Sequence, residues 1–124
     1  MRLLLDTHVF LWWLMDDDAL SADVKETIDT EAEVLVSAVS VWEIAIKQAL
    51  GKIVGLPDLS RIVDTCGLVE LPIRSRHAIE AGGLPLLHRD PLDRMLIAQA
   101  RCEGLTLMSR DEQVQRYDVA LRPV

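Results

Sequence analysis

The sequence predicts an α/β fold in which helices cover both faces of a mainly parallel sheet. Two observations support this class. The strand-like segments, such as residues 3–5 and 34–36, are continuously apolar, as in strands buried on both faces. These segments alternate with amphipathic helices, which is the pattern of α/β proteins. Half of the 124 residues are hydrophobic, so we expect one domain, residues 1–124, with a sizeable core.

The first half of the chain divides at clear signals. Residues 2–6 are expected to form a buried strand, and residues 9–15 a helix that ends at an acidic run. Ser21 is placed to cap a second helix that extends to about residue 31. The apolar residues 34–36 predict a strand over 33–37, and Ser40 predicts the start of a helix that ends near Gly51.

In the second half, residues 57–66 look helical, residues 68–71 form a third strand, and residues 75–81 form a short helix. Asp90 followed by Pro91 predicts an N-cap and the first position of a helix over 91–103, which Gly104 ends. A fourth strand is expected at residues 105–108 and a fifth at 119–121.

Acidic residues follow the strands of this predicted sheet. Right-handed crossovers bring the carboxyl ends of parallel strands to one edge, where sites form in open sheets. Asp6 and Asp111 lie just past two strands, and Glu43 and Asp93 fall in the first turns of helices that can open at this edge. The strand order therefore predicts that Asp6, Glu43, Asp93 and Asp111 converge.

Each acid also has a structural reading. Glu43 completes a capping box with Ser40 and is spaced to pair with Lys47. Against this reading, Glu43 shares one side of its helix with the apolar residues Val39, Ile46 and Leu50.

The acids later in the chain can also be interpreted either as helix caps or as site residues. Asp90 reads mainly as a cap, and its membership of the site stays open. Asp93 shares a core-facing stripe with Ile97 and Ala100, which favours a site residue. Asp111 could cap a short helix over 112–117, whereas Asp6 is the hardest to explain structurally.

Taken together, these acids call for a cation. Two carboxylates about 4 Å apart repel by roughly 4 kcal/mol at an effective dielectric near 20. Mg²⁺ or Mn²⁺ turns this repulsion into attraction, and no His/Cys cluster offers zinc a closed site; His8 and His88 read as polar contacts or packing residues. The chemistry that follows is metal-assisted hydrolysis of a phosphodiester.

Composition limits the partners. The net charge of −7 argues against bulk electrostatic binding to nucleic acid, although a local basic rim could hold a phosphate backbone. That rim would draw on Arg74, Arg76, Arg89, Arg94, Arg110, Lys47 and Lys52. Cys66 and Cys102 read as free thiols, and Asp6 comes too early for a signal peptide. We therefore expect a cytoplasmic protein without membrane contact.

Four segments resemble, in order, the acidic motifs of PIN-domain ribonucleases, in particular the VapC-type toxins of bacterial toxin–antitoxin pairs. The segments are Leu-Leu-Asp-Thr-His at 4–8, Ser-Ala-Val-Ser-Val-Trp-Glu-Ile at 37–44, His-Arg-Asp-Pro-Leu-Asp-Arg-Met-Leu-Ile-Ala at 88–98 and Leu-Thr-Leu-Met-Ser-Arg-Asp at 105–111. The match covers nearly the whole chain. One departure is that many relatives carry the last acid three positions later, where this chain has Val114; Asp111 is expected to replace it.

The resemblance implies a three-layer sandwich around a five-stranded, mainly parallel sheet. It implies an RNA-cleaving toxin that uses Mg²⁺ or Mn²⁺, forms a homodimer and is held inactive by a cognate antitoxin. Asp6, Glu43, Asp93 and Asp111 would then be catalytic, with Asp6, Asp93 and Asp111 as metal ligands. Ser109 is a weaker candidate for orienting a water.

Other readings remain open. A phosphotransferase with an aspartyl nucleophile usually has a second Asp where this chain has His8. A PIN nuclease of RNA processing and a non-catalytic PIN-fold binding module are the closer alternatives. Trp12, Trp13 and Trp42 read first as core or interface packing, with base stacking as the lesser alternative. A partner segment that carries Arg or Lys into the carboxylate pocket would explain inhibition.

Overall fold

The computed structural model describes residues 1–124 and is built around a five-stranded sheet. The strands lie in the order β3-β2-β1-β4-β5, and every neighbouring pair is parallel. Their bounds are β1 Arg2–Leu5, β2 Glu33–Ser37, β3 Val69–Leu71, β4 Thr106–Ser109 and β5 Leu121–Pro123. The predicted α/β class with a parallel central sheet is confirmed.

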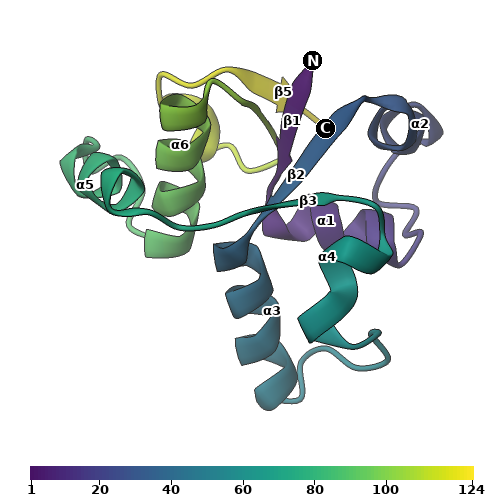
Figure 1. Ribbon diagram of the computed structural model, residues 1–124. Coiled ribbons are helices and arrows are strands. Elements are labelled where there is room, and N and C mark those ends of the chain that lie inside the picture. The colour runs from purple at the N-terminus through teal and green to yellow at the C-terminus, as the bar shows by residue number, and fades with distance from the viewer.

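Helices cover both faces of this sheet (Figure 1). They are α1 Thr7–Leu14, α2 Ala22–Thr30, α3 Ala38–Ala49, α4 Ile62–Thr65, α5 Ser75–Gly83 and α6 Pro91–Glu103, with 3₁₀ turns η1 Leu59–Arg61 and η2 Val114–Arg116. Successive residues of β1 point to opposite faces. Leu3 and Leu5 join a core with α1, α2 and α4, whereas Leu4 packs with α6 on the other face.

Local chemistry sets several helix ends where the sequence predicts them. The Ser21 hydroxyl accepts a hydrogen bond from the Val24 N–H at 3.2 Å and caps α2. Asp90 caps α6 ahead of Pro91. Gly104 ends α6 at a φ of 65°, in the left-handed region that glycine adopts without a Cβ penalty.

The predicted start of α3 at Ser40 is wrong. Ser37 caps the helix instead, because its hydroxyl accepts from the Val39 N–H at 3.0 Å. Ser40 is fully buried inside the helix, and its hydroxyl accepts from the Thr7 hydroxyl at 2.9 Å. This buried contact fixes the start of α3 beside the start of α1. Glu43 therefore lies in the second turn, and the capping box predicted with Ser40 does not form.

Two further boundaries differ from the prediction. Residues 57–66 are not one helix but the turn η1 followed by the single-turn α4, because the Asp58 carboxylate accepts from both the N–H and the hydroxyl of Ser60 and tightens the chain there. The fifth strand begins at Leu121, two residues later than expected, and Pro123 is tolerated because β5 is an edge strand.

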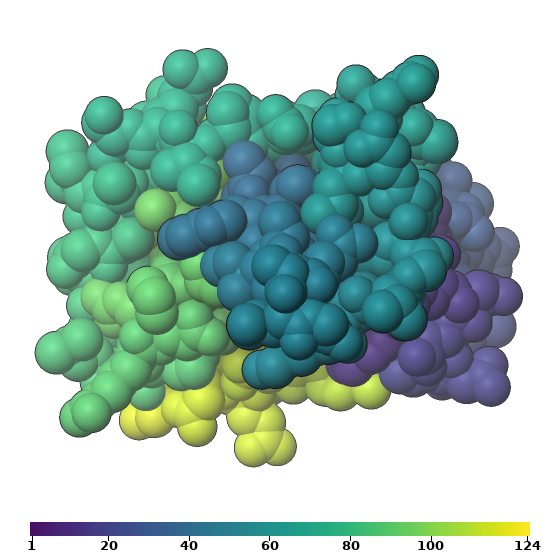
Figure 2. All heavy atoms as spheres, turned by 90° about the horizontal axis from the view of Figure 1, so that it is seen from below, coloured from purple at the N-terminus to yellow at the C-terminus, as the bar shows by residue number.

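The carboxyl ends of the strands meet at one edge of the sheet, which is the lower edge in Figure 1. Figure 2 views the molecule from this side, with α3 toward the viewer, α1 in purple at the right and the C-terminal segment in yellow at the lower rim. The starts of α1 and α3 lie at this edge, directly after β1 and β2. None of the helices combines the length and the apolar character that crossing a bilayer requires.

Candidate functional site

Asp6 is the most deeply buried acid at this edge. It follows β1, is 7% exposed and caps α1 by accepting the Val9 N–H at 2.8 Å. Burial raises the pKa of the Asp6 carboxyl above its ordinary value, because removing the charged form from water is costly. Hydrogen bonds from the Ser109 side chain and the Val9 N–H act in the opposite direction. Asp6 is thus held in place while its charge is left poorly compensated.

The end of β4 places a second acid beside Asp6. The Ser109 hydroxyl accepts from the Asp111 N–H at 3.1 Å, and the Asp111 carboxylate accepts from the Gln113 N–H at 2.8 Å. The charge of Asp111 contributes to the raised pKa of Asp6, and both acids line one cavity of about 300 Å³. Ser109 therefore joins the two acids. The helix predicted over residues 112–117 is only the 3₁₀ turn η2, and its N-cap is Gln113, which makes no side-chain cap hydrogen bond, so the predicted capping role of Asp111 is wrong.

Asp93 is linked to Asp111 through a histidine. The Asp93 Oδ2 lies 2.7 Å from the Nε2 of His88, and the same Nε2 lies 3.7 Å from the Oδ2 of Asp111. Burial, followed by the charges of Asp90 and Asp111, raises the pKa of Asp93 to about 6, and the His88 hydrogen bond partly opposes this. The structure thus connects Asp6, Asp111, His88 and Asp93 in a continuous group.

Asp90 and His88 extend the set of possible ligands. Each of His88, Asp90 and Asp93 offers one ligand atom, and these three atoms lie within 4.8 Å of one another. Asp90 also caps α6, accepting from the Leu92 N–H at 2.9 Å. The sequence marks His88 as a polar contact, but its place between two acids depends on the fold of residues 84–90.

Glu43 is the predicted acid that no contact joins to the others. Its carboxylate is 14% exposed and forms an ion pair with Lys47 at 3.1 Å, as the i, i+4 spacing predicts. The apolar stripe predicted around Glu43 continues only in part, because Val39 is buried whereas Ile46 and Leu50 are 39% and 64% exposed.

Arg94 does not belong to a basic rim for substrate. Its guanidinium is buried and donates to the carbonyls of Ala81, Leu84, Pro85 and His88 and to the Tyr117 hydroxyl. The expectation that it holds a phosphate backbone is therefore wrong. It fixes the segment between α5 and α6 that carries His88. Arg76 pairs with Glu103, the last residue of α6, at 2.5 Å, whereas the acids gather around the first turn of that helix.

The donor set suits a hard divalent cation. Mg²⁺ and Mn²⁺ prefer carboxylate oxygens, and the group supplies them from Asp6, Asp93 and Asp111. Burial leaves the charges of Asp6 and Asp93 poorly compensated, as their raised pKa values indicate. A cation would supply the missing compensation.

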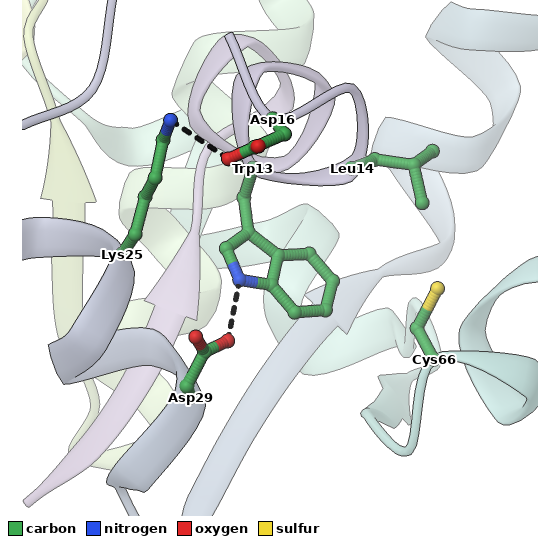
Figure 3. Close-up of a pocket in the computed structure, with 6 residues that line it drawn as sticks. All are labelled: Trp13, Leu14, Asp16, Lys25, Asp29 and Cys66. Carbon is green, nitrogen blue, oxygen red and sulfur yellow. Dashed lines mark hydrogen bonds and ion pairs between the residues drawn. The ribbon is translucent and has the colours of Figure 1, made fainter. Parts of the chain in front are cut away.

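A larger cavity, about 390 Å³, lies between the end of α1, α2 and the residue after α4 (Figure 3). Its polar groups already satisfy one another: Lys25 pairs with Asp16 at 2.8 Å, and the Trp13 N–H donates to Asp29 at 2.9 Å. None of the converging acids lines it.

A parallel α/β sheet with buried carboxylates grouped at its carboxyl edge defines the class of this protein. Residues 3–120 match the family model described as the PIN domain. The chain belongs to the PIN domain family.

Comparison with individual proteins gives the same fold. The chain is 27% identical over 121 residues to Ribonuclease VapC22 of Mycobacterium tuberculosis (strain ATCC 25618 / H37Rv), covering 92% of this chain and 90% of that protein. VapBC2 from Rickettsia felis, solved bound to a DNA fragment from its promoter, gives a TM-score of 0.72 at 14% identity and covers 100% of this chain and 99% of its own. FitAcB from Neisseria gonorrhoeae gives 0.69 at 21% identity and covers 97% and 96%.

Proposed function

We propose that this protein is a metal-dependent endoribonuclease that acts in the cytoplasm as the toxin of a toxin–antitoxin pair. The observation that carries the proposal is the continuous group of Asp6, Asp111, His88 and Asp93 at the carboxyl edge of the sheet. The likeness to Ribonuclease VapC22 supports the ribonuclease activity, and the VapBC2 and FitAcB structures support an antitoxin partner.

Asp6, Asp93 and Asp111 would hold a Mg²⁺ or Mn²⁺ ion. When bound, the ion supplies Lewis acidity toward the phosphate oxygens and a water of lowered pKa. The other tasks fall to the chain. A carboxylate of the group accepts a proton from the attacking water, and His88 orients the Asp93 carboxylate through its 2.7 Å contact. Ser109 holds Asp6 and Asp111 in register.

Glu43 enters the proposal as the fourth acid. Its helix begins beside α1, because the Thr7 hydroxyl bonds to Ser40. The Glu43 carboxylate is mostly shielded from solvent, and its ion pair with Lys47 neutralises its charge. We assign Glu43 to the catalytic group on its position in the second acidic motif.

The surface of α3 supports a homodimer. Trp42, Ile46 and Leu50 recur every four residues along this helix and are 58%, 39% and 64% exposed. Large apolar side chains that share one face of a surface helix mark protein interfaces. We assign this face to a second copy of the chain, and the carboxylate pocket to an Arg or Lys of the antitoxin.

The test is cleavage of single-stranded RNA with Mg²⁺, with Mn²⁺ and with a chelator. The wild type should cut only with a metal ion. Asp6→Asn should lose at least about 100-fold in rate, because a general base or ligand charge is removed. Asp23→Asn, an exposed acid in the first turn of α2, is the matched control and should retain activity. If Asp6→Asn cuts RNA as well as the wild type does, the assigned chemistry is wrong.

A further inference from the structure

The cavity of about 300 Å³ beside the acids has a second, non-acidic half. Asp6 and Asp111 form one part of its lining, and His8, Trp12 and Arg110 form the rest. This volume lies at the lower end of the range for small-molecule pockets, ~300–1,000 Å³. The three remaining side chains combine two aromatic rings with a cation. They have no role in holding the proposed metal ion.

The guanidinium of Arg110 is fixed over Trp12. Its Cζ lies 4.6 Å from the centroid of the Trp12 ring, within the range of a cation–π contact. Its Nε donates to the Val124 carbonyl at 3.0 Å, and its Nη2 donates to the Ala19 carbonyl. Arg110 pairs with no Asp or Glu side chain in a chain of net charge −7, and its Nη1 donates no hydrogen bond within the chain. The Nη1 of this fixed guanidinium can therefore donate to a phosphate or a base carbonyl.

His8 and Trp12 form an aromatic wall next to this cation. They lie one turn apart on α1, with ring centroids 5.9 Å apart and planes tilted by 41°. His8 is exposed, and Trp12 is half-buried against the core. Aromatic faces of this kind stack on nucleobases without regard to sequence, and a guanidinium plane adds to the stacking.

We propose that this pocket binds one unpaired nucleobase of the RNA strand, with the base against His8 and Trp12 and Arg110 contacting the strand. The inference rests on the proposed ribonuclease function. Because Asp6 and Asp111 line the same cavity, a base bound there places an adjoining phosphate beside the acidic group. Since a base can stack on a side chain only when it has left its own helix, the pocket selects single-stranded RNA.

The test uses an RNA oligonucleotide that the wild type cleaves, together with copies in which one base at a time is replaced by an abasic residue. For the wild type, one position near the cut should lower kcat/KM by about 5- to 100-fold, the loss expected when one stacked base is removed. Trp12→Leu, which keeps apolar packing, should show that loss on intact RNA and no further loss with the abasic copy. Trp12→Phe should restore most of the activity.

Trp13→Leu is the matched control, because the neighbouring indole points toward Asp29 in the other cavity (Figure 3). It should leave kcat/KM and the abasic profile unchanged. Thermal unfolding of each variant establishes that it is folded. Binding of the same RNA to Asp6→Asn, followed by fluorescence anisotropy with and without Trp12→Leu, separates affinity from turnover.

The outcomes distinguish the two proposals. If the wild type cleaves RNA but no abasic position matters, or the abasic penalty persists in Trp12→Leu, the base pocket is wrong and the ribonuclease stands. If the wild type cleaves nothing while Trp12→Leu weakens RNA binding, the nuclease fails and the base pocket is supported. If Trp12→Leu changes only the retention of a co-expressed antitoxin, the pocket serves that protein and the inference is overturned.

Discussion

Replacing Asp93 by Asn should stabilise the metal-free protein. Burial raises the pKa of this carboxyl from 3.8 to about 6, a shift of about two units. At ~1.36 kcal/mol per unit, holding the charged form in the folded state costs about 3 kcal/mol near neutral pH. Asn removes that charge and can still accept the hydrogen bond from the His88 Nε2, which lies 2.7 Å away. We therefore expect a gain of about 1–3 kcal/mol at pH 7.5.

The raised pKa of Asp93 also sets how the stability of the protein changes with pH. The folded protein holds the Asp93 proton up to about pH 6, whereas an unfolded aspartate releases it near 3.8. The folded state binds more protons between these values, so the contribution of Asp93 to stability falls as the pH rises from about 4 to 6 and stays low above it. The difference between wild type and Asp93→Asn should be small at pH 4 and should reach its full size by pH 7.

The assay is urea unfolding in a chelating buffer at a series of pH values, with thermal unfolding as a second measurement. For a chain of this size, about 1 kcal/mol corresponds to a Tm change of roughly 3–5 °C. Asp23→Asn, which removes an exposed acid from the first turn of α2, should instead lose a few tenths of a kcal/mol. Mg²⁺ should then stabilise the wild type more than Asp93→Asn, because the ion binds the charged form. A marked loss of stability in metal-free Asp93→Asn would refute this reasoning.

Three further predictions concern neighbouring features. Glu43→Gln should lower RNA cleavage by at least about 10-fold, whereas Lys47→Met, which breaks the same ion pair, should not; equal losses in the cleavage assay would make Glu43 structural. If the proposed homodimer forms through α3, Trp42→Glu combined with Ile46→Glu should give a folded monomer, as measured by light scattering after size exclusion; a dimer that persists in this variant would show that the interface is not on α3. Arg94→Met should lower the free energy of unfolding in urea by at least about 3 kcal/mol, because it leaves several buried carbonyls without donors. A loss below about 1 kcal/mol would count against the role of Arg94 in fixing this segment.

Sequence reasoning succeeds where a feature depends on a few adjacent residues. The start of α6 follows from Asp90 and Pro91, and its end follows from Gly104; both signals act within one turn. The strand order places Asp6 and Asp111 at one edge because parallel strands in an α/β sheet share their direction.

Sequence reasoning fails where two nearby residues can each form the same local structure, or where segments far apart in the sequence meet. Ser37 and Ser40 can each cap a helix, and the choice is made by the buried bond between Ser40 and Thr7, which are 33 positions apart. His88 reaches Asp111 only because residues 84–90 fold back over the start of α6. The residues of the sequence motif do not encode that path.

Asp93 and Arg94 show how one helix turn serves both the site and its support. Adjacent helical residues point about 100° apart, so the acid faces the carboxylate group while the arginine faces the interior. There Arg94 holds the carbonyls of residues 84, 85 and 88, with Tyr117 donating to the Pro85 carbonyl at 2.6 Å. The segment fixed in this way carries His88 back to Asp93 and Asp111. Arg94 therefore acts on the site only through the backbone carbonyls that it holds in place. A basic residue within an acidic motif is not by itself evidence of contact with substrate.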